Sequence, residues 1–164
     1  MIITDTGIYP GTLKSGDVLI QENGSIHACN GCMDCWWKTP GVCSRKDTLM
    51  KISSLLEQTD ELVIVSCCLY GSFSCFVQKV LERMMPYFMP EYETQEGCMV
   101  HKCRADRNIG VSVYFYGNQL EESERMNAQS VVRRLSLRLG GRIRRIMFVA
   151  DAMQIGGLSG RSYL

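Results

Sequence analysis

The segment ELVIVSCCLY, residues 61–70, constrains the fold of this chain more than any other stretch. Leu62 to Val65 are continuously apolar, with branched side chains and no polar residue at alternate positions. Such a run is typical of a strand that is buried on both faces, as in a parallel sheet covered by helices. We therefore expect this strand at the centre of the sheet.

Strands and helices alternate along most of the chain, which indicates an α/β domain with a three-layer, doubly wound parallel sheet of about five strands. Besides the central strand, we expect strands at residues 1–4, 17–21, 109–116 and 143–149. We expect helices at 47–58, with Asp47 as its N-cap, at 74–85 and at 120–139. The pattern predicts one domain over residues 1–150, an irregular excursion at 86–107 and a loose tail at 151–164.

The connection between the first two strands is unusual. Only about a dozen residues separate them, which is close to the minimum for a parallel crossover. This linker, DTGIYPGTLKSG, contains three glycines and a proline, which disfavour a helix. The first crossover helix is therefore expected to be missing.

Composition excludes some classes of function. No apolar run approaches the length of a membrane-spanning helix, and the N-terminus lacks a cationic and apolar signal peptide, so we expect a cytoplasmic protein without membrane contact. The formal net charge is +1. Seven arginines lie between Arg125 and Arg145, but no aromatic residue alternates with them, which favours a solvated helix face over a nucleic-acid surface.

The chain has nine cysteines, and four of them follow the spacing C-x2-C-x2-C-x7-C. Without a secretion signal, they indicate reduced thiols or metal ligands more than a disulfide framework. The first three positions agree with a bacterial ferredoxin run, whereas the fourth lies farther away. A [4Fe-4S] cluster, a structural zinc ion and free thiols stay open as alternatives for these residues, which are Cys29, Cys32, Cys35 and Cys43. The smaller group of Cys98, His101 and Cys103 lacks a fourth ligand and is interpreted as incidental.

The cysteine run and the segment DELVIVSCCLYGSFSCFVQKVLERM together resemble the flavodoxin-like NAD(P)H-dependent FMN reductases, and among them the iron-sulfur flavoproteins. The similarity spans residues 26–150, and its specific motifs lie within residues 29–83. In that family the loop after the central strand usually carries a Ser-Pro pair, a tyrosine and a glycine. Ser66, Tyr70 and Gly71 match, and Cys67 replaces the proline.

The resemblance implies a flavodoxin-like fold and an FMN site at two loops. Gly71 would let the backbone approach a flat ring, and Tyr70 could stack on it. The family's phosphate-binding loop and first helix are absent here, and the Asp5 carboxylate would repel a phosphate. The implied flavin-binding residues are Ser66, Cys67, Cys68, Leu69, Tyr70, Gly71, Ser72, Phe73, Tyr116, Gly117 and Asn118.

Three functions follow as hypotheses. The first is an FMN-dependent NAD(P)H oxidoreductase, with a nicotinamide nucleotide as hydride donor and an unspecified electron acceptor. The second is an iron-sulfur flavoprotein that carries electrons through a [4Fe-4S] cluster on the four-cysteine run. The third is a non-catalytic flavodoxin-like scaffold that has lost flavin binding. By analogy with reductases that complete their flavin pocket across subunits, we expect a homodimer.

Overall fold

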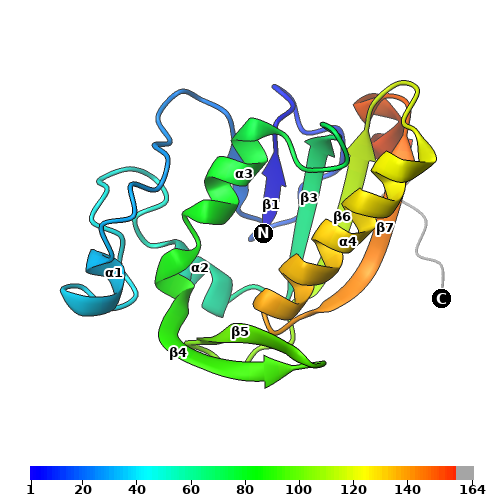
Figure 1. The fold of residues 1–164 in the computed structure, drawn as a ribbon. Coiled ribbons are helices and arrows are strands. Elements are labelled where there is room, and N and C mark those ends of the chain that lie inside the picture. Colours follow the sequence, from blue (N-terminus) through cyan, green and yellow to red (C-terminus); the bar gives the residue numbers. More distant parts are fainter. Residues whose placement is uncertain (158–164) are drawn as a thin grey trace.

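The computed structural model describes residues 1–157, and five parallel strands form its main sheet (Figure 1). Their spatial order is β2 (Leu19–Gln21), β1 (Ile2–Thr4), β3 (Glu61–Cys67), β6 (Gly110–Tyr116) and β7 (Arg142–Val149). The prediction of a central buried strand is confirmed, because β3 lies between β1 and β6 and Leu62, Ile64 and Val65 have no exposed surface. The chain has the α/β, flavodoxin-like doubly wound fold.

Helices cover one face of this sheet. These helices are α2 (Ile52–Glu57), α3 (Cys75–Glu82) and α4 (Glu122–Arg138), and η1 (Met85–Tyr87) is a 3-10 turn after α3. Helix α1 (Asp34–Trp37) lies away from the sheet and contacts η1 (Figure 1). In Figure 1, α3 and α4 lie in front of the strands. Apolar side chains of α2, α3 and α4 meet Ile64 and Phe115 in one core, and the burial of this apolar surface is the main stabilising contribution of that layer.

The opposite face of the sheet carries a thin layer. Residues 5–18, between β1 and β2, contain no helix, so the predicted loss of the first crossover helix is confirmed. Val65 and Tyr114 pack there against Tyr9 and against Ile155 of η2 (Ala152–Gly157). The expectation of a loose tail is wrong for residues 152–157, because Ile155 is buried; residues 158–164 lie outside the described part.

The predicted irregular excursion at 86–107 is wrong. Its residues form an antiparallel hairpin of β4 (Phe88–Gln95) and β5 (Cys98–Cys103). The two-residue turn consists of Glu96 and Gly97, both with positive φ, which is the backbone that hairpin turns of this length require. Glu-Gly is not among the common turn pairs, and Pro90 weakens the strand pattern, which explains the failure of the prediction.

The helix predicted from Asp47 begins later. Residues 48–51 form turns and α2 starts at Ile52, after Lys51. Asp47 is not its N-cap because both carboxylate oxygens bind other groups, described below. No helix in residues 1–157 is long and apolar enough to cross a membrane.

Candidate functional site

The four cysteines of the C-x2-C-x2-C-x7-C run line one cavity of about 410 Å³. The cavity lies between the cysteine segment, residues 29–43, and the end of α3 with the turn that follows, from which Arg83, Met85 and Pro86 contribute. Arg138 of α4 completes the wall. The structure thus brings together all four residues that the sequence singled out as candidate metal ligands.

Backbone geometry turns the cysteine segment around this cavity. Gly31 and Met33 both adopt the left-handed conformation, with φ of 68° and 58°, so the chain reverses between successive cysteines. Farther along, the amide of Gly41 donates to the carbonyl of Cys35 at 3.1 Å, and the amide of Cys43 donates to the carbonyl of Met50 at 3.0 Å. The first bond closes the chain between Cys35 and Gly41, and the second fixes Cys43 to the turn before α2.

The thiols lie within electrostatic reach of one another. Burial raises the pKa of Cys35, and the neighbouring Cys43, Cys29 and Cys32 raise it further. Within residues 1–157, no three Cys, His, Asp or Glu side chains converge closely enough to hold a single metal ion. The four cysteines nevertheless line one cavity, and soft thiolates are the ligands that iron-sulfur clusters use.

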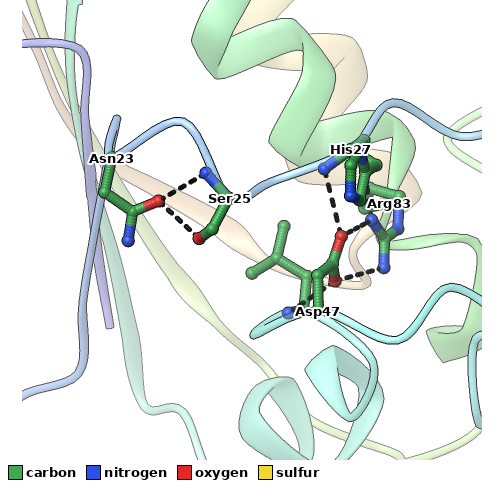
Figure 2. A network of polar contacts seen from close by, with 6 residues as sticks. Asn23, Ser25, His27, Asp47 and Arg83 are labelled. Atoms are coloured by element: carbon green, nitrogen blue, oxygen red, sulfur yellow. Dashed lines mark hydrogen bonds and ion pairs between the residues drawn. The ribbon is translucent and has the colours of Figure 1, made fainter.

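A buried ion pair lies where the two ends of the cysteine segment meet (Figure 2). Arg83, which has no exposed surface, donates to both carboxylate oxygens of Asp47, at 2.5 and 2.7 Å. The amide of His27 donates to Asp47 at 3.1 Å, and the carbonyl of His27 accepts from Arg83 at 2.7 Å. Because His27 and Asp47 flank the cysteine segment, this bidentate pair holds its two ends together.

Two arginines, Arg83 and Arg138, and one acidic residue, Glu82, lie in the wall of the cysteine cavity. Arg83 lines the cavity, and its buried Nε has no hydrogen-bond partner. Arg138 stacks on Phe88, with its guanidinium carbon 4.5 Å from the ring centre, and it has no carboxylate partner among the described residues. Cations beside thiols favour the thiolate form, and Arg138 is the cation of this wall that pairs with no carboxylate of the described residues.

The loops that follow three parallel strands lie at one edge of the sheet. Asp5 follows β1, Cys67 ends β3 and Tyr116 ends β6. The Asp5 carboxylate accepts a hydrogen bond from the Cys67 amide at 2.9 Å and another from the Tyr116 hydroxyl at 3.1 Å. Asp5 therefore occupies the corner of the sheet edge where the resemblance places the missing phosphate loop.

The predicted flavin loop, residues 66–73, folds into a compact turn. The amides of Leu69 and Ser72 each donate to the other's carbonyl at 2.9 Å. Ser66 is buried, and its hydroxyl accepts from the Ser74 amide at 2.9 Å. Tyr70, at the tip, is 90% exposed. Several backbone donors that could face a ligand are therefore already bonded within the protein.

The other predicted flavin-binding residues differ in how far they are exposed to solvent. Cys68 and Phe73 are buried, and Phe73 stacks on Phe115 with ring centres 5.2 Å apart. The amide of Gly117 donates to Val149 at 3.1 Å, whereas Asn118 is exposed. The two loops thus lie at the same edge of the sheet, with Tyr70 and Asn118 as exposed side chains.

Gly71 provides a test of how tightly this loop packs on α4. Its φ is +72°, and a Cβ there would lie 2.7 Å from the Glu124 carbonyl oxygen and 2.8 Å from Asn127 Cβ. We expect Gly71→Ala to lower the free energy of unfolding by about 1–3 kcal/mol more than Gly97→Ala. Gly97 is the matched control, because its φ is +75° with no atom within 4 Å of the added methyl group. Chemical denaturation of both variants measures the difference, and equal losses would contradict the packing argument.

Sequence reasoning missed the residues that support the cysteine cavity. Arg83, Asp47 and Arg138 come from the end of α3, the loop before α2 and the end of α4. For Arg83 the sequence offered one local signal, namely that a charged residue stands among the apolar residues of segment 74–85. No protein-family model matches the chain, and no curated protein matches it.

Proposed function

We propose that this chain is a flavodoxin-like electron-transfer protein that holds an iron-sulfur cluster on Cys29, Cys32, Cys35 and Cys43. The observation that carries the proposal is that these four thiols line one cavity with two guanidinium groups in its wall. A [4Fe-4S] cluster, when bound, supplies one-electron redox chemistry. A reducing cytoplasm, where thiols stay free, fits this assignment.

The residues of the chain have distinct parts in this proposal. The thiols supply the ligands after losing their protons, and Arg83 and Arg138 offset the negative charge that this creates. Asp47 keeps Arg83 in place through two hydrogen bonds. Trp36 packs beside the segment, with its ring nitrogen donating to the Met85 carbonyl at 3.3 Å, whereas Trp37 is 68% exposed.

Anaerobic purification followed by measurement of the visible spectrum, iron and acid-labile sulfide tests the proposal. We expect a broad shoulder near ~400 nm and about four iron and four sulfide per chain, directly or after reconstitution. A colourless protein with one zinc per chain would show a structural zinc site instead. Failure to take up iron, sulfide or zinc would leave the cysteines as free thiols and support the scaffold hypothesis.

A flavin site at the sheet edge is the second candidate, and the meeting of residues 66–73 with residues 116–118 at that edge favours it. In this version the protein is an FMN-dependent oxidoreductase that takes hydride from a nicotinamide nucleotide, and a homodimer would complete the pocket.

Asp5 leads to a specific expectation for flavin binding. Its carboxylate takes the place of a phosphate site and would repel a phosphate, so we expect FMN to bind no more tightly than riboflavin. Titration followed by quenching of flavin fluorescence measures both dissociation constants. FMN binding that is more than tenfold tighter would show a phosphate site that Asp5 does not block, and no binding of either flavin would remove this candidate.

A further inference from the structure

A second cavity, of about 500 Å³, lies between the β4–β5 hairpin and α4. Figure 1 shows the hairpin near the C-terminal end of that helix. Met99, Val100 and Leu137 give it apolar walls, and Arg134 and Arg138, one helical turn apart, add positive charge. We call it the hairpin cavity.

Part of the wall of the hairpin cavity is flat and aromatic. Tyr92 and His101, paired across the hairpin, stack with ring centres 4.2 Å apart and an angle of 28° between their planes. Tyr92 is 59% exposed. The Nδ1 atom of His101 is buried and has no hydrogen-bond partner, so it is an unsatisfied polar group beside the cavity.

The charge of the hairpin cavity is uncompensated within the described part of the chain. Arg138 is largely desolvated, which lowers its pKa, and its guanidinium contacts the Met85 sulfur at 3.2 Å and the Phe88 ring instead of a carboxylate. Arg134, which is exposed, also makes no ion pair in the described part of the chain, whereas the adjacent Arg133 pairs with Glu96 at 3.1 Å. A desolvated cation without a counter-ion is costly, so an anion is the complementary ligand.

We propose that the hairpin cavity binds a small planar organic anion. An aromatic or quinoid ring would lie against Tyr92 and the apolar walls, and a carboxylate or sulfonate would face Arg134 and Arg138. The hairpin cavity adjoins the cysteine cavity, because Arg138 lines both and Trp36, next to Cys35, lies 5.0 Å from His101 between ring centres. Titration of the protein without a cluster tests this inference separately from the proposed function, because Arg138 then has no cluster charge beside it.

Titration of the full chain with anthraquinone-2-sulfonate tests this proposal. The Trp37→Phe variant serves as the background, because Trp36 is then the only tryptophan and reports on the neighbouring His101. Calorimetry measures affinity, and Trp36 fluorescence locates the ligand. We expect saturable binding that quenches Trp36 and is at least about tenfold tighter than that of the uncharged 2-(hydroxymethyl)anthraquinone.

Two neighbouring arginines provide the matched pair of variants. Arg134→Ala is expected to weaken binding of the sulfonate about fivefold, and Arg133→Ala, whose side chain pairs with Glu96, to change it less than about twofold. Arg138→Gln is expected to weaken it about tenfold, with a thermal melt to establish that the variant is folded. Equal binding of the charged and uncharged probes, equal effects of the two alanine variants, or no saturable binding up to about 1 mM would overturn the proposal.

Discussion

Replacing Asp47 with alanine is expected to lower the free energy of unfolding by about 3–5 kcal/mol, the largest loss we anticipate for a single substitution outside the apolar core. The change leaves Arg83 as a buried cation without its carboxylate, since the two side chains are 2% and 0% exposed. It also removes the acceptor that holds the His27 amide. Urea denaturation monitored by circular dichroism measures the loss.

An exposed ion pair in the same protein supplies the control. Arg107 and Asp60 are 2.6 Å apart, but Asp60 is 92% exposed, so Asp60→Ala is expected to cost less than about 1 kcal/mol. If Asp47→Ala and Asp60→Ala had similar effects, the buried pair would not hold the cysteine segment in the way we describe.

The same pair makes stability depend on pH in a defined range. Burial by itself would raise the pKa of Asp47, but hydrogen bonds from Arg83, His27 and Leu49 outweigh it and lower the pKa to about 2. A carboxyl group with a lowered pKa stabilises the fold fully above its unfolded pKa, near 4, and this contribution disappears as pH falls toward 2. Asp47→Asn should therefore flatten the stability profile between about pH 4 and pH 2, measured by denaturation at a series of pH values.

Replacing any one of the four cavity cysteines with serine is the second large effect we expect. A hard hydroxyl is a poor ligand for iron in place of a thiolate, so each of the four variants should retain less than about one tenth of the iron of the parent after reconstitution. The absorption near ~400 nm should fall in proportion. Iron, sulfide and absorbance measured on the same samples give the result.

Cys75→Ser is the matched control for these variants. Cys75 is an exposed free thiol at the start of α3 and does not line the cysteine cavity, so its loss should leave the iron content unchanged. Because Cys35 is buried, its serine variant needs a thermal melt to separate loss of ligand from loss of fold. Iron retained by all four variants would place the metal elsewhere and contradict the proposed function.

The order and type of the main elements could be predicted from the sequence for a local reason. Leu62 to Val65 are apolar without alternation, and the segment that forms α3 has apolar residues at helical spacing followed by Pro86. These patterns depend on which face of a helix or strand is buried, and the spacing of apolar residues within a short window indicates that face. The clustering of the four cysteines was visible in the sequence for the same reason, since they lie within fifteen residues.

The hairpin was less accessible to sequence reasoning. Its turn uses Glu96 with Gly97, and its strands are held in part by the contact of Tyr92 with His101 across nine positions of the chain. Local propensity is weak in such strands, and pairing with a partner strand decides their structure. His101, which the sequence analysis interpreted as incidental together with Cys98 and Cys103, lies in the wall of the hairpin cavity.

By itself the sequence determined the α/β fold, the central position of β3, the missing first crossover helix and the identity of the four clustered thiols. Only the tertiary structure decided what surrounds those thiols. Asp47 and Arg83 are 36 positions apart and Arg138 is farther still, so their meeting depends on how α3 and α4 pack on the sheet. A buried charge is tolerated where an opposite charge on another element pairs with it. Such a pair joins residues that are far apart in the sequence, so no local pattern predicts it.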